Sequence, residues 1–175
     1  MNYHNITMDD MVNGEGLRTT LFVSGCEHRC YGCQNPQTHS LSSGILFDNE
    51  AKEELMDNLK KDYISGVTFS GGDPFHPKNR KELLKLCKEI KTRFPEKTIW
   101  VYTGYRYETL CNELAEKRID ILNYIDVMCD GKFYVRMADA NIPWVGSSNQ
   151  RVIDVKKTIK SSKEKMCVVS YNSNT

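Results

Sequence analysis

The sequence has no long hydrophobic run and no excess of charge of one sign. No stretch of its 175 residues approaches the roughly 20 apolar residues of a membrane span, and residues 1–7 lack the basic and then apolar pattern of a signal peptide. The 24 Lys and Arg residues nearly balance the 23 Asp and Glu residues, whereas nucleic-acid-binding proteins gather Lys and Arg against phosphates. We therefore expect a cytoplasmic protein that binds neither nucleic acid nor membrane.

The sequence also lacks an internal linker, a repeat and any low-complexity block. A chain of this length buries roughly 70% of its unfolded surface on folding, so its core needs no disulfide or structural metal. We expect one domain over residues 1–155 and a Lys-rich extension over residues 156–175. The Lys residues favour a solvated helix face, and we expect the polar end of the extension to be partly disordered.

Short β-branched runs alternate with stretches of helical periodicity, which is typical of βαβ units around a parallel sheet. We expect strands at residues 19–24, 67–70, 98–103, 125–129 and 151–155. Between them, apolar residues repeat at the spacing of one helix face. These stripes predict helices through Leu55, Leu59 and Tyr63 with Asp48 as N-cap, through Leu83, Cys87, Ile90 and Phe94, and through Leu110 and Leu114 within residues 107–117.

The predicted fold class is α/β with a mostly parallel sheet. A complete eight-unit β/α barrel needs about 250 residues, so this chain builds part of a barrel or an open sheet. In both architectures ligands bind at the carboxyl ends of the strands. Polar, glycine-containing segments follow the expected strands there, at residues 24–26, 70–73, 103–105 and 130–133.

Three cysteines lie within eight residues just after the first expected strand: Cys26, Cys30 and Cys33. An odd total of seven cysteines in a reducing compartment favours thiols, metal ligands or catalytic groups over disulfides. A [4Fe-4S] cluster is usually held by four thiolates, so three would leave one iron open to a substrate. The local pattern therefore favours an iron–sulfur cluster.

Two other interpretations of the cysteine triplet stay open. Cys30 and Cys33 alone are spaced like a redox dithiol, although such a pair needs no third thiol at Cys26. The triplet with His28 or His39 has the ligand types of a zinc site, although closed zinc sites usually draw on two separated pairs. These alternatives predict a dithiol oxidoreductase and a small zinc-binding module.

A second feature is the segment Gly71-Gly72-Asp73, which follows the expected strand at residues 67–70. Two glycines let backbone groups approach a ligand closely, and Asp73 offers a carboxylate to a cationic group. The same residues, followed by proline, are also typical of a simple strand-to-helix turn.

The cysteine loop and the Gly-Gly-Asp loop together resemble the radical S-adenosylmethionine superfamily. Within it, the chain resembles the activating proteins of anaerobic ribonucleoside-triphosphate reductases, which are activases of glycyl radical enzymes. The matching segments occur in the family's order and cover roughly the first 155 residues. They are residues 13–18, 21–26, 69–77, 102–105, 130–133 and 146–150.

The resemblance implies a partial β/α barrel that holds a [4Fe-4S] cluster and S-adenosylmethionine. It implies cluster ligands at Cys26, Cys30 and Cys33, and cofactor contacts at Gly32, Cys33, Gln34, Gly71, Gly72 and Asp73. Reductive cleavage of the cofactor would give a 5′-deoxyadenosyl radical that takes hydrogen from a glycine of the reductase's large subunit. The implied partners are that subunit and an electron donor such as reduced flavodoxin. Another glycyl radical enzyme, such as pyruvate formate-lyase, is the alternative target.

The remaining candidates have more ordinary interpretations. We expect Cys87, Cys111, Cys129 and Cys167 to be small buried apolar residues. We expect Trp100 and Trp144 to serve in packing. For Asp130, Lys132, Phe133 and residues 147–150, a structural turn and contacts at the rim of the site stay open.

Overall fold

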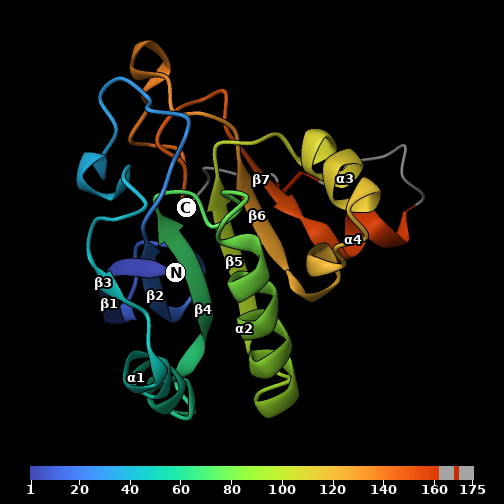
Figure 1. The fold of residues 1–175 in the computed structure, drawn as a ribbon. Coiled ribbons are helices and arrows are strands. Elements are labelled where there is room, and N and C mark those ends of the chain that lie inside the picture. Colours follow the sequence, from blue (N-terminus) through green and yellow to red (C-terminus); the bar gives the residue numbers. More distant parts are fainter. Residues whose placement is uncertain (162–167, 170–175) are drawn as a thin grey trace.

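The computed structural model describes residues 1–161 and 168–169 and has an α/β fold (Figure 1). Its seven-stranded sheet has the order β3-β1-β2-β4-β5-β6-β7. The strands are β1 (Asn2–Asp10), β2 (Leu17–Val23), β3 (Ile45–Leu46), β4 (Ile64–Gly71), β5 (Thr98–Thr103), β6 (Val127–Asp130) and β7 (Arg151–Asp154). The predictions for Cys167 and for the polar end of the chain lie outside the described residues.

The centre of the sheet is parallel and its edges are antiparallel. β2, β4, β5 and β6 run in the same direction, whereas β1, β3 and β7 each oppose their neighbours. The five predicted strands are confirmed, with shifts of up to three residues at their ends. β1 and β3 were missed because β1 is a half-buried run with polar and acidic residues, and β3 has only two exposed residues. Neither offers a continuous apolar signal.

The described helices are α1 (Asn49–Leu59), α2 (Arg80–Arg93), α3 (Tyr107–Glu116) and α4 (Val155–Lys160), with 3₁₀ turns at Pro36–Thr38, Ile121–Tyr124 and Val135–Met137. The predicted cap of α1 is confirmed, because the Asp48 side chain accepts from the Ala51 amide at 3.0 Å. The prediction that Tyr63 belongs to this stripe is wrong: α1 ends at Leu59 and Tyr63 is exposed. No helix in the described part of the chain is long and apolar enough to cross a membrane.

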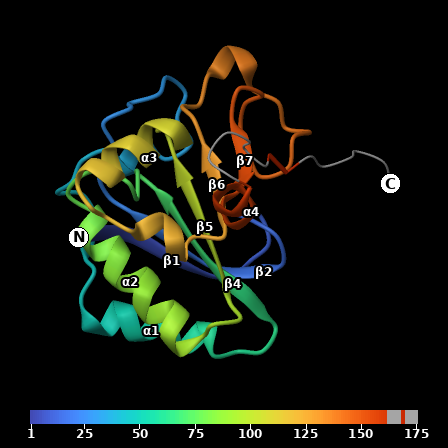
Figure 2. The ribbon, with the colours of Figure 1, turned by 90° about the vertical axis from the view of Figure 1, so that its right-hand side faces the viewer.

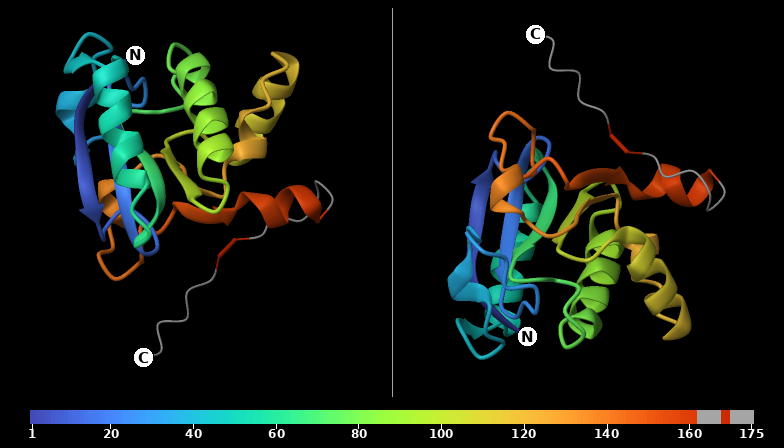
Figure 3. Two further views of the ribbon diagram at one scale, coloured as in Figure 1. Left: turned by 90° about the horizontal axis from the view of Figure 1, so that it is seen from below. Right: turned by 90° about the horizontal axis from the view of Figure 1, so that it is seen from above.

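All three long helices cover the same face of the sheet. The parallel strands follow one another in chain order, and right-handed crossovers then place each connecting helix on one side (Figure 3). α1 and α2 lie side by side (Figure 2), joined by the ion pair Lys52–Glu89 at 3.4 Å. The main core fills the space between helices and sheet. It includes Leu21, Phe69, Val101 and Met128 from the strands and Leu55, Leu83, Ile90 and Leu110 from the helices.

The opposite face of the sheet carries a smaller cluster and a buried arginine. Trp100 packs against Trp144 with ring centroids 5.1 Å apart, as expected of packing residues. The Arg18 side chain packs against β4, where it donates to Thr68 Oγ1 at 2.7 Å and to the Val67 carbonyl at 2.8 Å. Burial lowers the pKa of Arg18 to about 10. This face is therefore partly polar, whereas the helix-covered face is apolar.

Candidate functional site

The three predicted thiols lie in one loop that begins where β2 ends. The loop is closed at its base, since the Gly25 amide donates to the Thr38 carbonyl at 2.7 Å and the Cys26 amide to the His39 carbonyl at 3.0 Å. In Figure 1 it stands at the top, where the loops after the parallel strands gather. The cysteines are thus at the carboxyl edge of the sheet, where ligands bind in folds of this kind.

The loop turns sharply between its cysteines. The Cys33 amide donates to the Cys30 carbonyl at 3.1 Å, and the backbone is left-handed at Arg29 (φ 46°) and at Gly32 (φ 74°). Glycine suits the second of these positions because it adopts positive φ without a Cβ clash. Cys26, Cys30 and Cys33 are each half-buried, so each thiol lies between the protein interior and the open edge.

The donor set fits a cluster better than a single ion. Among the described residues, no three His, Cys, Asp or Glu side chains are grouped closely enough to surround one metal ion. In a [4Fe-4S] cluster each thiolate binds a different iron, so the sulfurs need not converge on one point. Burial raises the pKa of the Cys26 thiol, and coordination to a metal would overcome this because a bound thiol is deprotonated outright. Three thiols in one loop therefore suit a cluster whose fourth iron is open to a substrate.

Asp73 lies just beyond the end of β4, with only 1% of its side chain exposed. Oδ1 accepts from the Phe75 amide at 2.8 Å, and the Thr103 hydroxyl lies 3.0 Å from both carboxylate oxygens. Oδ2 also accepts from the Gly104 amide at 3.0 Å and lies 2.8 Å from Nε2 of His28. A direct bond from Asp73 to a cofactor ammonium would require the carboxylate to release one of these donors.

His28, between the first two cysteines, sits in a shaped niche at the end of β5. Its ring contacts that of Tyr105 edge to face, with centroids 4.5 Å apart. A Cβ on Gly104 would come within 2.2 Å of the ring, so a larger residue there would force the ring to shift. The residue before His28, Glu27, makes a separate contact: its carboxylate lies 3.2 Å from Nε2 of His76. From the sequence, residues 103–105 were expected to follow a strand and residues 102–105 to match the family, but the contact with His28 was not predicted. The signal was the glycine after a buried strand.

Gly71 and Gly72 are required where two strand ends approach one another. A Cβ on Gly71, where φ is 99°, would lie 2.8 Å from the backbone of Phe22, and one on Gly72 would lie 2.6 Å from the Gly25 carbonyl oxygen. The Gly72 amide donates to the Val23 carbonyl at 2.7 Å. The Gly-Gly-Asp loop is therefore fastened directly to the base of the cysteine loop.

The remaining predicted contacts, Gly32 and Gln34, lie on the exposed side of the cysteine loop. A Cβ on Gly32 would meet Val135 at 3.4 Å, and a Cβ on Gly146 would meet the Gln34 amide nitrogen at 3.5 Å. The structure thus brings this side of the cysteine loop against the segment that follows β6.

Asp130, at the end of β6, is surrounded by partners from within the fold, as the structural-turn interpretation predicts. It is fully buried, accepts from Nε of Arg151 at 2.9 Å and from the Tyr107 amide at 2.8 Å, and pairs with Arg106 at 3.3 Å. Hydrogen bonds to Asp130 and then to Glu108 raise the pKa of Arg151. The turn interpretation also suits Gln150, whose side chain bonds the Gly146 amide and the Gly131 carbonyl. Lys132 stays exposed, and Phe133 is half-buried.

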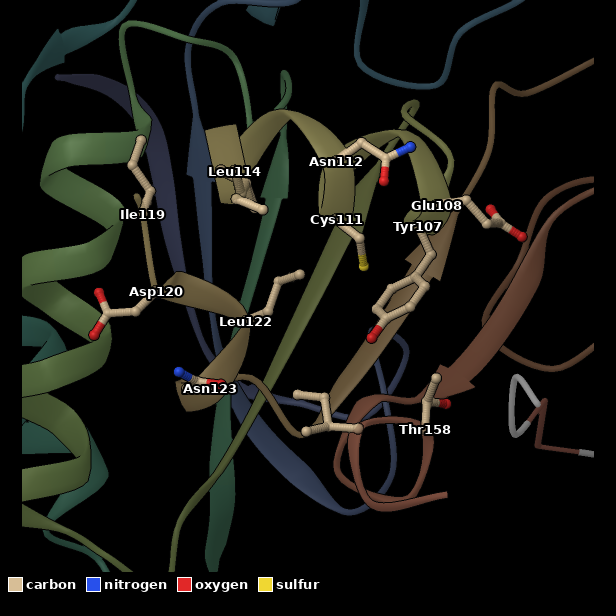
Figure 4. A pocket seen from close by; sticks show the side chains of 12 residues that line it. Tyr107, Glu108, Cys111, Asn112, Leu114, Ile119, Asp120, Leu122, Asn123 and Thr158 are labelled. Atoms are coloured by element: carbon tan, nitrogen blue, oxygen red, sulfur yellow. The ribbon is translucent and has the colours of Figure 1, made fainter. Parts of the chain in front are cut away.

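The other described cysteines are not grouped with the triplet. Cys87 and Cys129 are buried, as expected, and burial raises the pKa of the Cys129 thiol to about 12. Cys111 is half-buried and lines a pocket of about 550 Å³ between α3, the 121–124 turn and α4 (Figure 4). That pocket is lined by residues of these three elements and by Ile119 and Asp120 between two of them, and none of its lining residues belongs to the cysteine loop.

An α/β fold with a three-thiol loop at the carboxyl edge of its sheet is the arrangement expected of a protein that holds one iron–sulfur cluster. The family model of a 4Fe-4S single cluster domain matches residues 12–153. Relatives named anaerobic ribonucleoside-triphosphate reductase-activating protein include one from Haemophilus influenzae, 45% identical over 152 residues that cover 86% of this chain and 96% of that protein. That of Enterobacteria phage T4 is 44% identical (87% and 93% covered), and that of Escherichia coli K12 is 42% identical over 154 residues (87% and 97%).

The chain therefore belongs to the family of anaerobic ribonucleoside-triphosphate reductase-activating proteins. Its cofactors are those of this family: a [4Fe-4S] cluster and, for the activase reaction, S-adenosylmethionine.

Proposed function

We propose that this chain activates an anaerobic ribonucleoside-triphosphate reductase by generating a glycyl radical in it. The observation that carries the proposal is the closed loop with three half-buried thiols, fastened to the Gly-Gly-Asp loop at the carboxyl edge of the sheet. Family membership over most of the chain supports the same reaction.

When bound, the cluster and S-adenosylmethionine would supply one-electron chemistry: reductive cleavage of the bond between sulfonium and 5′ carbon would give methionine and a 5′-deoxyadenosyl radical, and transfer of one hydrogen atom from a glycine of the reductase would leave 5′-deoxyadenosine and a glycyl radical. The chain itself positions the cofactor and keeps competing hydrogen donors away. We propose a low-potential donor such as reduced flavodoxin as the electron source, and a cytoplasmic setting.

We propose Cys26, Cys30 and Cys33 as the cluster ligands. For the cofactor we propose the surrounding loops, with contacts at Gly32, Cys33, Gln34, Gly71, Gly72 and Asp73. The tight backbone approach of Gly71 and Gly72 to the base of the cysteine loop supports a shared site. We also propose that the sheet is a partial barrel over residues 1–155, with residues 156–175 as an extension.

The reductase would approach beside the cysteine loop. Tyr31 in that loop is 85% exposed, and Tyr134, Val135 and Met137 are exposed next to it around a hollow of about 450 Å³. Large exposed apolar side chains in one patch are typical of a binding surface. We expect Val135→Asp to weaken the complex at least about tenfold in an anaerobic binding assay, corresponding to about 1.4 kcal/mol. Leu46→Asp, at another exposed apolar site, on β3, is the matched control.

The decisive experiment is anaerobic reconstitution of the cluster, chemical reduction of the cluster, and then incubation with S-adenosylmethionine and the reductase. We expect about four irons and four sulfides per chain, formation of 5′-deoxyadenosine, and a glycyl radical in the reductase by electron paramagnetic resonance. Zinc in place of iron, or a cluster that produces no 5′-deoxyadenosine, would refute the proposal. A radical formed in pyruvate formate-lyase but not in the reductase would transfer the activity to that target.

A further inference from the structure

We propose that His28 is a positioning residue that fixes the cysteine loop through Asp73, and so determines how firmly the loop holds its cluster. The inference rests on the proposed function, because it assigns a role beside the cluster ligands. It gives Asp73 a task other than contact with the cofactor. The structural basis is a contact between two motifs that are 45 residues apart in the sequence.

The contact between His28 and Asp73 is short and buried. Nε2 of His28 lies 2.8 Å from Oδ2 of Asp73, and the two side chains are 9% and 1% exposed. An ionised carboxylate only accepts hydrogen bonds, so the imidazole is the donor. Such charge-assisted bonds are roughly twice as strong as neutral ones, and their worth rises when water is excluded.

Groups other than His28 fix the orientation of the Asp73 carboxylate. The Thr103 hydroxyl and the amides of Phe75 and Gly104 hold Asp73 between the ends of β4 and β5. These donors come from the rigid sheet edge, not from the cysteine loop. Asp73 is therefore a fixed anchor, and His28 is the group that the anchor holds.

The end of β5 is shaped around the imidazole ring. Gly104 leaves room that any side chain would fill, because its Cβ would lie 2.2 to 2.7 Å from three atoms of the His28 ring. Tyr105 contacts the ring from another side, and burial raises the pKa of Tyr105 to about 12, so its ring stays neutral. Residues 103–105 thus supply an anchor bond, a space and an aromatic wall to one histidine.

Because His28 lies between two of the cysteines, its contact with Asp73 affects the positions of both thiols. His28 is two residues from Cys26 and two from Cys30, and the backbone at the neighbouring Arg29 is held at a φ of 46°. A shift of His28 would therefore displace both cysteines. Groups that orient metal ligands in this way typically change metal affinity by 10–100-fold when they are removed, and they tune the reduction potential of the metal.

The test compares cluster-loaded wild-type protein with His28→Ala, His28→Gln and Asp73→Asn. The readouts are the rate of iron loss to a chelator, the reduction midpoint potential, and the electron paramagnetic resonance spectrum of the reduced cluster with and without S-adenosylmethionine. We expect His28→Ala to lose iron at least about tenfold faster, at the lower end of the outer-shell range. Its potential and spectrum should shift as well. His28→Gln should recover part of each effect, because its amide can donate to Asp73.

A double variant separates the proposed link from two independent effects. If His28 acts through Asp73, His28→Ala combined with Asp73→Asn should lose iron no faster than the worse single variant. His4→Gln is the matched control: His4 is half-buried and lies 2.9 Å from the Ser43 hydroxyl, and none of its described contacts involves Asp73 or residues 26–33. Circular dichroism of each variant checks the fold. If His28→Ala does not fold, His28→Gln and Gly104→Ala test the same contact.

The outcomes distinguish this inference from the proposed function. If the wild type binds no cluster or cleaves no S-adenosylmethionine, the proposed function fails. If the wild type does both and His28→Ala keeps the wild-type rate of iron loss, potential and spectrum, only the inference about His28 is overturned. A second result also overturns it: the wild-type spectrum does not change when S-adenosylmethionine is added, and His28→Gln loses iron as fast as His28→Ala. His28 would then be an iron ligand.

Discussion

Two buried carboxylates occupy equivalent places at the carboxyl edge of the sheet and do different work. Asp73 follows β4 and Asp130 ends β6, and both are almost completely buried. Asp73 accepts from a hydroxyl, backbone amides and the imidazole of His28. Asp130 instead pairs with the guanidinium groups of Arg106 and Arg151.

The difference lies in what each anchor holds. The pairs of Asp130 join β6 to β7 and to the start of α3, which are permanent parts of the fold. The donors of Asp73 join the sheet edge to the cysteine loop, which carries the proposed ligands. We conclude that the Asp130 region maintains stability and that the Asp73 region maintains the geometry of the site. Each of the following predictions tests this division.

The largest difference is expected between substitutions of one cysteine in each region. Cys26→Ser should abolish cluster binding and all 5′-deoxyadenosine formation, because a serine hydroxyl does not replace a thiolate on iron. Cys129→Ser, beside Asp130, should keep its iron, since a buried cysteine of this kind serves in packing. Anaerobic iron and sulfide analysis with an absorbance spectrum measures both. Loss of iron from Cys129→Ser alone would reverse the assignment.

Asp130→Asn should be the most destabilising of the variants that retain the cluster. Removing one partner of a buried ion pair leaves uncompensated charge, and we expect a cost of about 3 kcal/mol. The estimate is at the low end of the range because Arg106 and Arg151 both reach solvent. Denaturant unfolding followed by circular dichroism gives the free energy of unfolding. A variant with unchanged stability but faster iron loss would contradict the division between the two regions.

Gly104→Ala should destabilise the protein by about 2 kcal/mol, because the new Cβ overpacks the His28 ring. The same substitution in a His28→Ala background should cost less than about 1 kcal/mol, since the clashing ring is gone. Unfolding free energies of the four proteins in this cycle measure the coupling. Equal costs in both backgrounds would show that Gly104 is needed for its backbone alone.

Much of the fold could be predicted from the sequence because the parallel strands are continuous apolar runs. The bounds of β5 agree with the prediction, and Leu110 and Leu114 pack on the core as their spacing indicates. The edge strands β1 and β3 were not predicted, because half-exposed strands carry a weaker apolar pattern. β7 is antiparallel because residues 131–150 leave and re-enter the sheet at the same edge, where Arg151 pairs with Asp130, and local patterns do not encode this connection.

The site was predictable in its residues but not in its contacts. The spacing of Cys26, Cys30 and Cys33 is visible in one loop, so a metal site could be inferred directly. Two partners of Asp73, Thr103 and Gly104, lie at the end of β5, and the register of β4 and β5, with Phe69 opposite Val101, brings them to the carboxylate. A carboxylate after a glycine pair is typical of ligand binding and of a turn alike, so its satisfied hydrogen bonds required the structure.

The smallest effect concerns the exposed end of the Asp130 region. Glu108 pairs with Arg151 at 2.9 Å, and the hydrogen bond from Arg151 holds the pKa of Glu108 below its usual value. A lowered folded-state pKa adds stability above the unfolded value of about 4.3, and that stability is lost as the pH falls through the folded value. Because the Glu108 side chain is largely exposed, screening limits the contribution.

We therefore expect Glu108→Gln to cost less than about 1 kcal/mol at neutral pH. The difference from wild type should shrink as the pH falls from the unfolded pKa of about 4.3 through the lowered folded pKa, and also in about 1 M salt, which screens exposed pairs. Denaturant unfolding across pH and salt measures this difference. Persistence of the full difference at low pH would mean that Glu108 acts through packing, and the pairing of Arg151 would then rest on Asp130 alone.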